Sequence, residues 1–174
     1  MHIDGLELTG NTANGSNISG GALFVSCSVE PRQVGIFNST ISNNTATGTK
    51  SARGGGLYVA SCGADPVSTT ISGNTLVNTG SADSQGGGVY SSYSTRNVRL
   101  YAGSSISGNT ADSGGGAWCS TGKWQIGGTL AGNNQADTDF MPLTFRLHAE
   151  LPAYPEHRLR IQASGYIAST YRWG

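Results

Sequence analysis

The chain carries little charge, and no apolar run is long enough to span a membrane as a helix. Only 11% of its 174 residues are charged, and ten basic side chains balance ten acidic ones. Without net charge to attract polyanions, the composition does not favour nucleic acid or an anionic membrane as a partner. A spanning helix needs about 20 predominantly apolar residues in succession, so we expect no membrane-spanning helix in this segment.

Cysteine and histidine are also scarce, which limits metal binding and nucleophilic catalysis. The three cysteines are spaced too widely to match a metal-ligand pattern. The three histidines, His2, His148 and His157, lie outside the repeats described below, and no nucleophile is paired with a general base. We therefore expect no catalytic residues, no metal and no cofactor.

Glycine, in contrast, is abundant, and many of its 27 copies take part in a repeat. One phrase has an aliphatic residue three positions before an asparagine, and it occurs five times: 8–13, 41–46, 71–76, 106–111 and 130–135. Its asparagines are Asn11, Asn44, Asn74, Asn109 and Asn133. A second phrase, Gly-Gly followed by small and apolar residues, alternates with the first at 20–25, 54–59, 86–91 and 114–119.

Each repeat contains apolar stretches that are too short for helices but rich in strand-forming residues. A single repeat cannot bury its own apolar face, whereas stacked repeats can. The spacing therefore predicts an all-β parallel β-helix of about five coils, with Gly, Ser and Asn at its corners. Stacking would place the aliphatic residues in an inward column and the asparagines in a hydrogen-bonded ladder; the aliphatic residues are Leu8, Ile41, Ile71, Ile106 and Leu130.

The phrases stop at about Gln135, which divides the chain into repeats (1–135) and a C-terminal segment (136–174). That segment has two alternating runs separated by PAYPEH, as in a β-hairpin. A solenoid needs a cap over its last coil, so we expect a C-terminal β-hairpin cap there. A separate tail or module is the alternative.

The two phrases together resemble the paired FxxN and GGA(I/L/V) motifs of chlamydial polymorphic outer membrane protein repeats, and more widely the right-handed, pectin-lyase-like β-helix group. The likeness covers about residues 5–135. Here Ile or Leu replaces the aromatic residue of FxxN, and only GGAL at 20–23 keeps the GGA form. The resemblance implies a right-handed coil and a secreted or cell-surface protein, outer membrane-associated, of the kind found in adhesins and autotransporter passenger segments.

An aromatic residue follows the apolar position of every second phrase; these residues are Phe24, Tyr58, Tyr90 and Trp118. If their neighbours point inward, the alternation of a strand turns the rings outward into a surface strip. The strip could bind a sugar or a protein. Alternatively, the rings only stack on one another.

Two of the cysteines occupy equivalent places in the repeat. Cys27 in SCSVEP and Cys62 in SCGADP are 35 residues apart. Stacked one coil apart, they could lie within disulfide distance. Two free thiols at equivalent positions are the alternative.

Two further patterns suggest functions that must be weighed against ordinary solvent exposure. Hydroxyl residues flank the inward aliphatic position (Thr40, Thr70, Ser105 and Thr129 before it, Ser42, Ser72 and Ser107 after it), which resembles loosely an ice-binding face. Glycan cleavage would need clustered carboxylates, for which Asp83, Asp112 and Asp137 are the candidates. Isolated aspartates in loops are usually turn formers.

The sequence thus favours a non-enzymatic surface or secreted module for adhesion or display, as a segment of a larger protein. Its expected partner is a protein or glycan on a host or neighbouring cell. A carbohydrate-binding or carbohydrate-cleaving β-helix is the alternative, and ice binding is a distant one.

Overall fold

A computed structural model describes residues 1–27, 33–92, 98–119, 124–126 and 129–130. Within these ranges the regular secondary structure consists of strands, without a helix. The strands form four sheets, here called A to D, and the pairings between them are parallel. The prediction of an all-β chain is confirmed, whereas the expected cap at 136–174 lies outside the described residues.

Each sheet takes its strands from successive repeats. Sheet A contains β1 (His2–Asp4), β5 (Gln33–Phe37), β9 (Gly63–Val67), β14 (Val98–Leu100) and β17 (Trp124–Ile126), in that order. Sheet B contains β2 (Glu7–Thr9), β6 (Thr40–Ser42), β10 (Thr70–Ser72), β15 (Ser105–Ser107) and β18 (Thr129–Leu130). Sheet D contains β4 (Leu23–Ser26), β8 (Leu57–Ala60), β13 (Val89–Ser91) and β16 (Ala117–Cys119).

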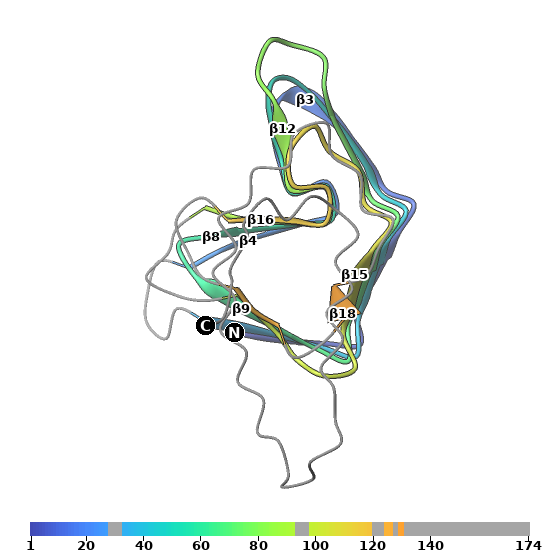
Figure 1. Ribbon diagram of the computed structural model, residues 1–174, viewed down its shortest axis with the longest axis vertical. Coiled ribbons are helices and arrows are strands. Elements are labelled where there is room, and N and C mark those ends of the chain that lie inside the picture. The colour runs from blue at the N-terminus through green and yellow to red at the C-terminus, as the bar shows by residue number, and fades with distance from the viewer. Residues whose placement is uncertain (28–32, 93–97, 120–123, 127–128, 131–174) are drawn as a thin grey trace, which may run out of the picture.

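Sheet C forms a narrow projection, here called the arm, at the top of Figure 1. It contains β3 (Thr12–Ser19), β7 (Thr45–Arg53), β11 (Thr75–Asn78) and β12 (Ser84–Gln85). The first half of β7 pairs with β11 and its last two residues pair with β12. The chain therefore runs outward and returns within each repeat.

Equivalent residues of successive repeats are direct neighbours across the sheets. Leu8 pairs with Ile41, Ile41 with Ile71, and Ile71 with Ile106. In Figure 1 the equivalent strands overlap when the molecule is viewed along this stack. The repeats seen in the sequence are therefore stacked in space with their phrases in register.

The corners between sheets use residues with a left-handed backbone, again in columns. One column is Gly5, Asn38, Ser68 and Gly103; a second is Gly10, Asn43, Gly73 and Gly108; a third is Gly20, Gly54, Gly86 and Gly114. In GGG the first glycine, Gly54, has φ +67, which glycine adopts readily. The second, Gly55, has no room for a side chain because a Cβ there would overlap the carbonyl oxygen of Gly87 in the next repeat.

The interior consists of two separate apolar clusters. The main core lies between sheets A, B and D and is built from Ile, Leu and Val with Cys62 and two alanines: Val25, Val34, Ile36, Ile41, Leu57, Val59, Cys62, Ala64, Ile71, Val89, Val98, Leu100, Ile106 and Ala117. The arm core is smaller and is mostly alanine: Ala46, Ala52, Leu76 and Ala111, with Ile18 packed against it. Of the predicted inward aliphatic column, Ile41, Ile71 and Ile106 belong to the main core, whereas Leu8 is partly exposed and the burial of Leu130 is not described.

Candidate functional site

The asparagines of the first phrase form the ladder that the sequence predicts, at the junction of sheet B and the arm. Asn44 Nδ2 donates to Asn74 Oδ1 at 2.8 Å, and Asn74 Nδ2 donates to Asn109 Oδ1 at 2.9 Å. Asn74 Nδ2 also donates to the carbonyl oxygen of Ile41. Asn11 joins the ladder through Asn44, while Asn133 lies outside the described residues. Because its amides are fully occupied by one another and by the backbone, this ladder serves the fold.

A second buried ladder, made of hydroxyl groups, was not anticipated. Its members directly precede Thr40, Thr70 and Ser105 in the chain and lie at the junction of sheets A and B; they are Ser39, Thr69 and Ser104. Ser104 Oγ accepts from the Thr69 backbone N–H at 3.1 Å, and Thr69 Oγ1 donates to the Ile36 carbonyl oxygen at 2.9 Å. Aligning the repeats would have revealed the column, since three of the five copies carry Ser or Thr there.

Three aromatic residues of the second phrase, Phe24, Tyr58 and Tyr90, are stacked, but two of them are buried. The ring centroids of Phe24 and Tyr58 are 5.2 Å apart, and those of Tyr58 and Tyr90 are 5.0 Å apart. Tyr58 and Tyr90 are only 9% and 4% exposed, whereas Phe24 is 50% exposed. The prediction of an exposed strip is therefore wrong for the two tyrosines, because each ring covers its neighbour and the Arg53 guanidinium lies over Tyr90. Trp118, in register with Tyr90, is partly exposed.

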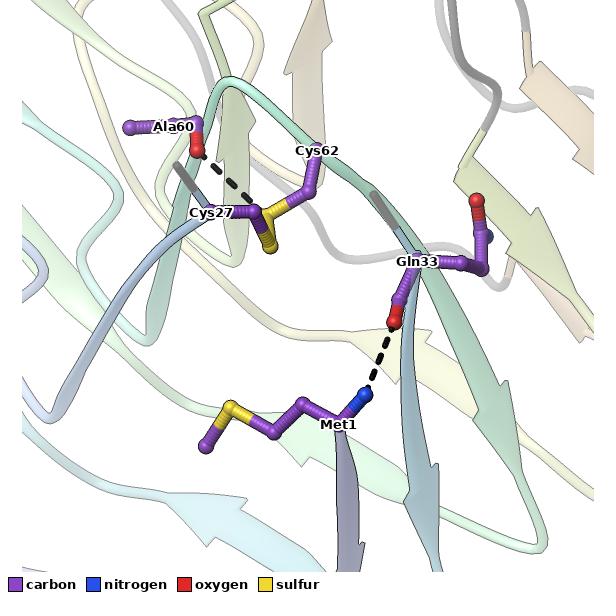
Figure 2. Close-up of a disulfide and its surroundings, with 5 residues drawn as sticks. All are labelled: Met1, Cys27, Gln33, Ala60 and Cys62. Atoms are coloured by element: carbon purple, nitrogen blue, oxygen red, sulfur yellow. Dashed lines mark hydrogen bonds between the residues drawn. A yellow bond between two sulfur atoms is a disulfide. The ribbon is translucent and has the colours of Figure 1, made fainter. Parts of the chain in front are cut away.

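Cys27 and Cys62 form a disulfide, which is one of the two states that the sequence left open. Their Cα atoms are 5.5 Å apart. Figure 2 shows the bridge where the chain passes from sheet D to sheet A, near the hydrogen bond that the Met1 amino group donates to the Gln33 carbonyl oxygen at 3.2 Å. The bridge joins equivalent turns of the first two repeats, so it fixes their stacking covalently.

Of the candidate acids, Asp83 and Asp112 lie in the described part of the chain, and they are not direct neighbours there. Asp112 Oδ2 accepts a hydrogen bond from the Ser84 backbone N–H at 2.8 Å, and Ser84 Oγ accepts one from the Asp112 N–H. Gln85 is opposite Ser113, so Ser84 rather than Asp83 is the neighbour of Asp112. Asp83 is exposed in the arm, and Asp137 lies outside the described residues. Within the described ranges, no group of three His, Cys, Asp or Glu side chains could hold a metal ion.

The predicted hydroxyl columns lie on the outward face of sheet B. Thr40, Thr70 and Ser105 are in register and partly exposed, and Thr129 is in register with Ser105. In the second column Ser72 and Ser107 are partly exposed, whereas Ser42 is only 8% exposed. The columns are regular, as expected for the solvent side of stacked strands.

The strongest cluster of polar side chains lies on the outward face of sheet A and was missed from the sequence. Asp65 Oδ1 accepts a hydrogen bond from Gln33 Nε2 at 2.7 Å, and Asp65 Oδ2 is 4.0 Å from Arg99 Nη1. Burial raises the pKa of the Asp65 carboxyl above its usual value, although the Gln33 hydrogen bond and the Arg99 charge act in the opposite direction. Such a partly desolvated carboxylate beside a cation is a common feature of binding sites.

An apolar column runs beside this polar cluster. Phe37, Val67 and Tyr101 are outward residues of three successive repeats, and Phe37 and Val67 pair across β5 and β9. A Cβ at Gly35 would overlap the Phe37 ring, so the ring lies over the backbone of the residue that pairs with Asp65. Tyr101 is 42% exposed, and Phe37 and Val67 are partly exposed. Sheet A therefore presents polar and aromatic side chains next to each other.

These features define the class of protein: it is a chain of stacked, parallel-stranded repeats with internal side-chain ladders. No helix among the described residues is long and apolar enough to cross a membrane. Comparison with known proteins found no matching family model, no matching curated protein and no matching solved structure.

Proposed function

We propose that the chain forms a right-handed parallel β-helix of about five coils over residues 1–135, closed by a C-terminal β-hairpin cap at 136–174. The in-register pairing of equivalent strands in sheets A, B and D supports a coil in which each repeat makes one turn. The alternation of the two phrases supports membership of the pectin-lyase-like group and likeness to polymorphic outer membrane protein repeats.

We propose further that this β-helix is a non-enzymatic module for adhesion or display, secreted or held at a cell surface in association with an outer membrane. The Cys27–Cys62 disulfide is the observation that carries this proposal. Disulfides persist in oxidising environments outside the cytosol and are rare within it. The two ladders support a structural role for the repeated phrases, which leaves binding to the outward side chains.

The first test concerns the compartment. The protein is isolated from its source in the presence of an alkylating agent, and its intact mass is measured with and without prior reduction. We expect two additional labels after reduction, because Cys27 and Cys62 are bridged. Labelling of all three cysteines without reduction would contradict an extracellular location.

The second test concerns adhesion. Beads coated with the full chain are added to a panel of bacterial and eukaryotic cells, and the retained beads are counted. We expect retention on at least one cell type and none with beads coated with heat-unfolded protein. Equal retention of both kinds of bead, or of neither, would contradict an adhesive function.

Glycan binding is a second candidate, because the outward face of sheet A combines hydrogen-bonding and aromatic groups. Cleavage is less well supported, since Asp112 is bound to the Ser84 backbone and Asp83 is not its neighbour. For an adhesin the expected partner is a protein or a glycan on a host or neighbouring cell, and sheet A favours the glycan.

A further inference from the structure

The outward residues of sheet A form two parallel columns that run along the stack. The polar column contains Asp65 and Arg99, which come together because Val98 pairs with Ala64 in the preceding positions. The apolar column contains Phe37, Val67 and Tyr101, two residues further along each repeat. We call these five residues the sheet A patch. Strand spacing separates its rows by about 4.8 Å.

The polar column offers both a hydrogen-bond acceptor and a donor. Asp65 Oδ1 is occupied by Gln33, whereas Oδ2 is 4.0 Å from the guanidinium, too far for a hydrogen bond. In the part of the chain that the structure describes, no other donor is recorded for Oδ2. The Asp65 side chain is 18% exposed and that of Arg99 is 43% exposed, so both can be reached from solvent. A ligand hydroxyl could donate to Oδ2 and accept from Arg99.

The apolar column offers flat surfaces beside these groups. The Phe37 ring lies over the backbone at Gly35, and the His2 ring stacks on it with centroids 4.4 Å apart and an interplanar angle of 23°. Tyr101 is at the opposite end of the column and is the most exposed of its members. Aromatic rings of this kind combine an apolar body with a polar tip and suit amphipathic ligands.

We propose that the sheet A patch binds an uncharged oligosaccharide that lies along the stack of repeats. A sugar ring has an apolar C–H face, which would lie on Tyr101, because the Phe37 ring is already stacked with His2. The hydroxyls at the edge of the sugar would reach Asp65 and Arg99. The opposite charges of these two residues cancel, so the patch favours a neutral chain over a uronate. The inference rests on the proposed adhesion function and names its ligand class.

Binding is measured by affinity electrophoresis in gels that contain soluble neutral polysaccharides (glucan, xylan or mannan), with polygalacturonate as the charged counterpart. Hits are then titrated with the corresponding hexasaccharide by calorimetry. We expect retardation by at least one neutral polymer. Tyr101→Ala should weaken binding at least 10-fold, and Tyr101→Phe, which keeps the ring, should weaken it much less.

Phe24→Ala is the matched control, because it removes a similarly exposed ring from sheet D. It should leave the affinity unchanged, and circular dichroism should show the same fold for each variant. No retardation by any neutral polymer, stronger binding to polygalacturonate, or loss of affinity in Phe24→Ala but not in Tyr101→Ala would overturn the proposal.

The bead assay separates this inference from the proposed function. If wild-type and Tyr101→Ala beads adhere equally and the gels show no Tyr101-dependent retardation, the module is an adhesin whose partner is bound elsewhere, and the patch proposal is wrong. If neither adheres while the gels show Tyr101-dependent retardation, the patch proposal stands and adhesion fails.

Discussion

The main core and the arm core are built from the same repeats but are packed with side chains of different size. In the main core Ile41, Ile71 and Ile106 stack with no exposed surface, one in each repeat. In the arm, the residues in register with Leu76 are alanines. The outgoing and returning parts of β7 leave little room, since a Cβ at Gly48 would lie 3.0 Å from that of Ala52. The short distance between the two backbone segments of the arm therefore admits only small side chains, whereas the main core has room for isoleucine.

The arm varies in length between repeats, and so does the connection from sheet D to sheet A. The arm segment of the third repeat extends from Asn74 to Gly86, and that of the fourth only from Asn109 to Gly114. In the main stack the strands stay in register across such a change: β5 begins seven residues after β4 ends, and β9 begins three residues after β8 ends. A thin layer at the side of a solenoid can be shortened at less cost because it buries less apolar surface.

The largest expected effect comes from the ladder that separates the two regions. Asn74→Leu removes hydrogen bonds to Asn44, Ile41 and Asn109 and leaves buried polar groups unpaired. At roughly 1–3 kcal/mol for each unpaired group, we expect a loss of about 4 kcal/mol or more in the free energy of unfolding. Urea denaturation monitored by circular dichroism measures it. Asn78→Ala, at a partly exposed arm position, is the control; a loss below about 1 kcal/mol for Asn74→Leu would show that the ladder contributes little.

Truncation of one aliphatic residue in each region tests the comparison directly. Ile71→Ala should cost about 3–5 kcal/mol, because neighbouring Ile41 and Ile106 cannot collapse into the cavity. Leu76→Ala should cost less, about 2–3 kcal/mol, since an alanine is already accommodated at the equivalent arm positions. Both values come from the same denaturation experiment. An equal or larger loss for Leu76→Ala would contradict the difference between the cores.

Two buried serines should respond in opposite directions to the same substitution. Ser91 is in register with Val59, and its Oγ is buried without a hydrogen-bond partner. Ser91→Val should therefore stabilise the protein by about 1–2 kcal/mol, since it removes an unpaired hydroxyl. Ser84→Val in the arm should destabilise it, because Ser84 Oγ donates to the Leu76 carbonyl oxygen and accepts from Asp112. Thermal unfolding midpoints measure both, and a lower midpoint for Ser91→Val would refute the assignment.

The smallest effect is expected at the surface of sheet A and depends on pH. Because the folded-state pKa of Asp65 is raised above its unfolded value, protonation stabilises the folded state. This contribution is fully present below the unfolded pKa and is lost as the pH rises through the folded pKa. Asp65→Asn should therefore raise the unfolding midpoint at pH 7. The gain should shrink at pH values below the usual aspartate range, and a gain that grows on acidification would contradict the direction of the shift.

The sequence alone indicated most of the main stack. Equivalent positions in successive repeats become neighbours, so the aliphatic column, the asparagine ladder and the proximity of Cys27 and Cys62 could be inferred from spacing. The disulfide itself was one of two alternatives that the sequence left open, and the structure decided between them. The same reasoning would have found Ser39, Thr69 and Ser104. Residues 136–174 were assigned to a cap from their alternation, and that assignment remains a prediction.

The tertiary structure alone decided exposure and the contacts between residues at different positions of the repeat. Alternation along a strand placed Tyr58 and Tyr90 outside the main core, but only the arm, through Arg53, and the adjacent rings determined that they are buried. Gln33 reaches Asp65 diagonally, from a position two residues off its register. The repeat in the sequence specifies which residues lie above one another in the stack. Burial and diagonal contacts depend in addition on the angle between neighbouring sheets, which the corners set and which the side-chain periodicity does not reveal.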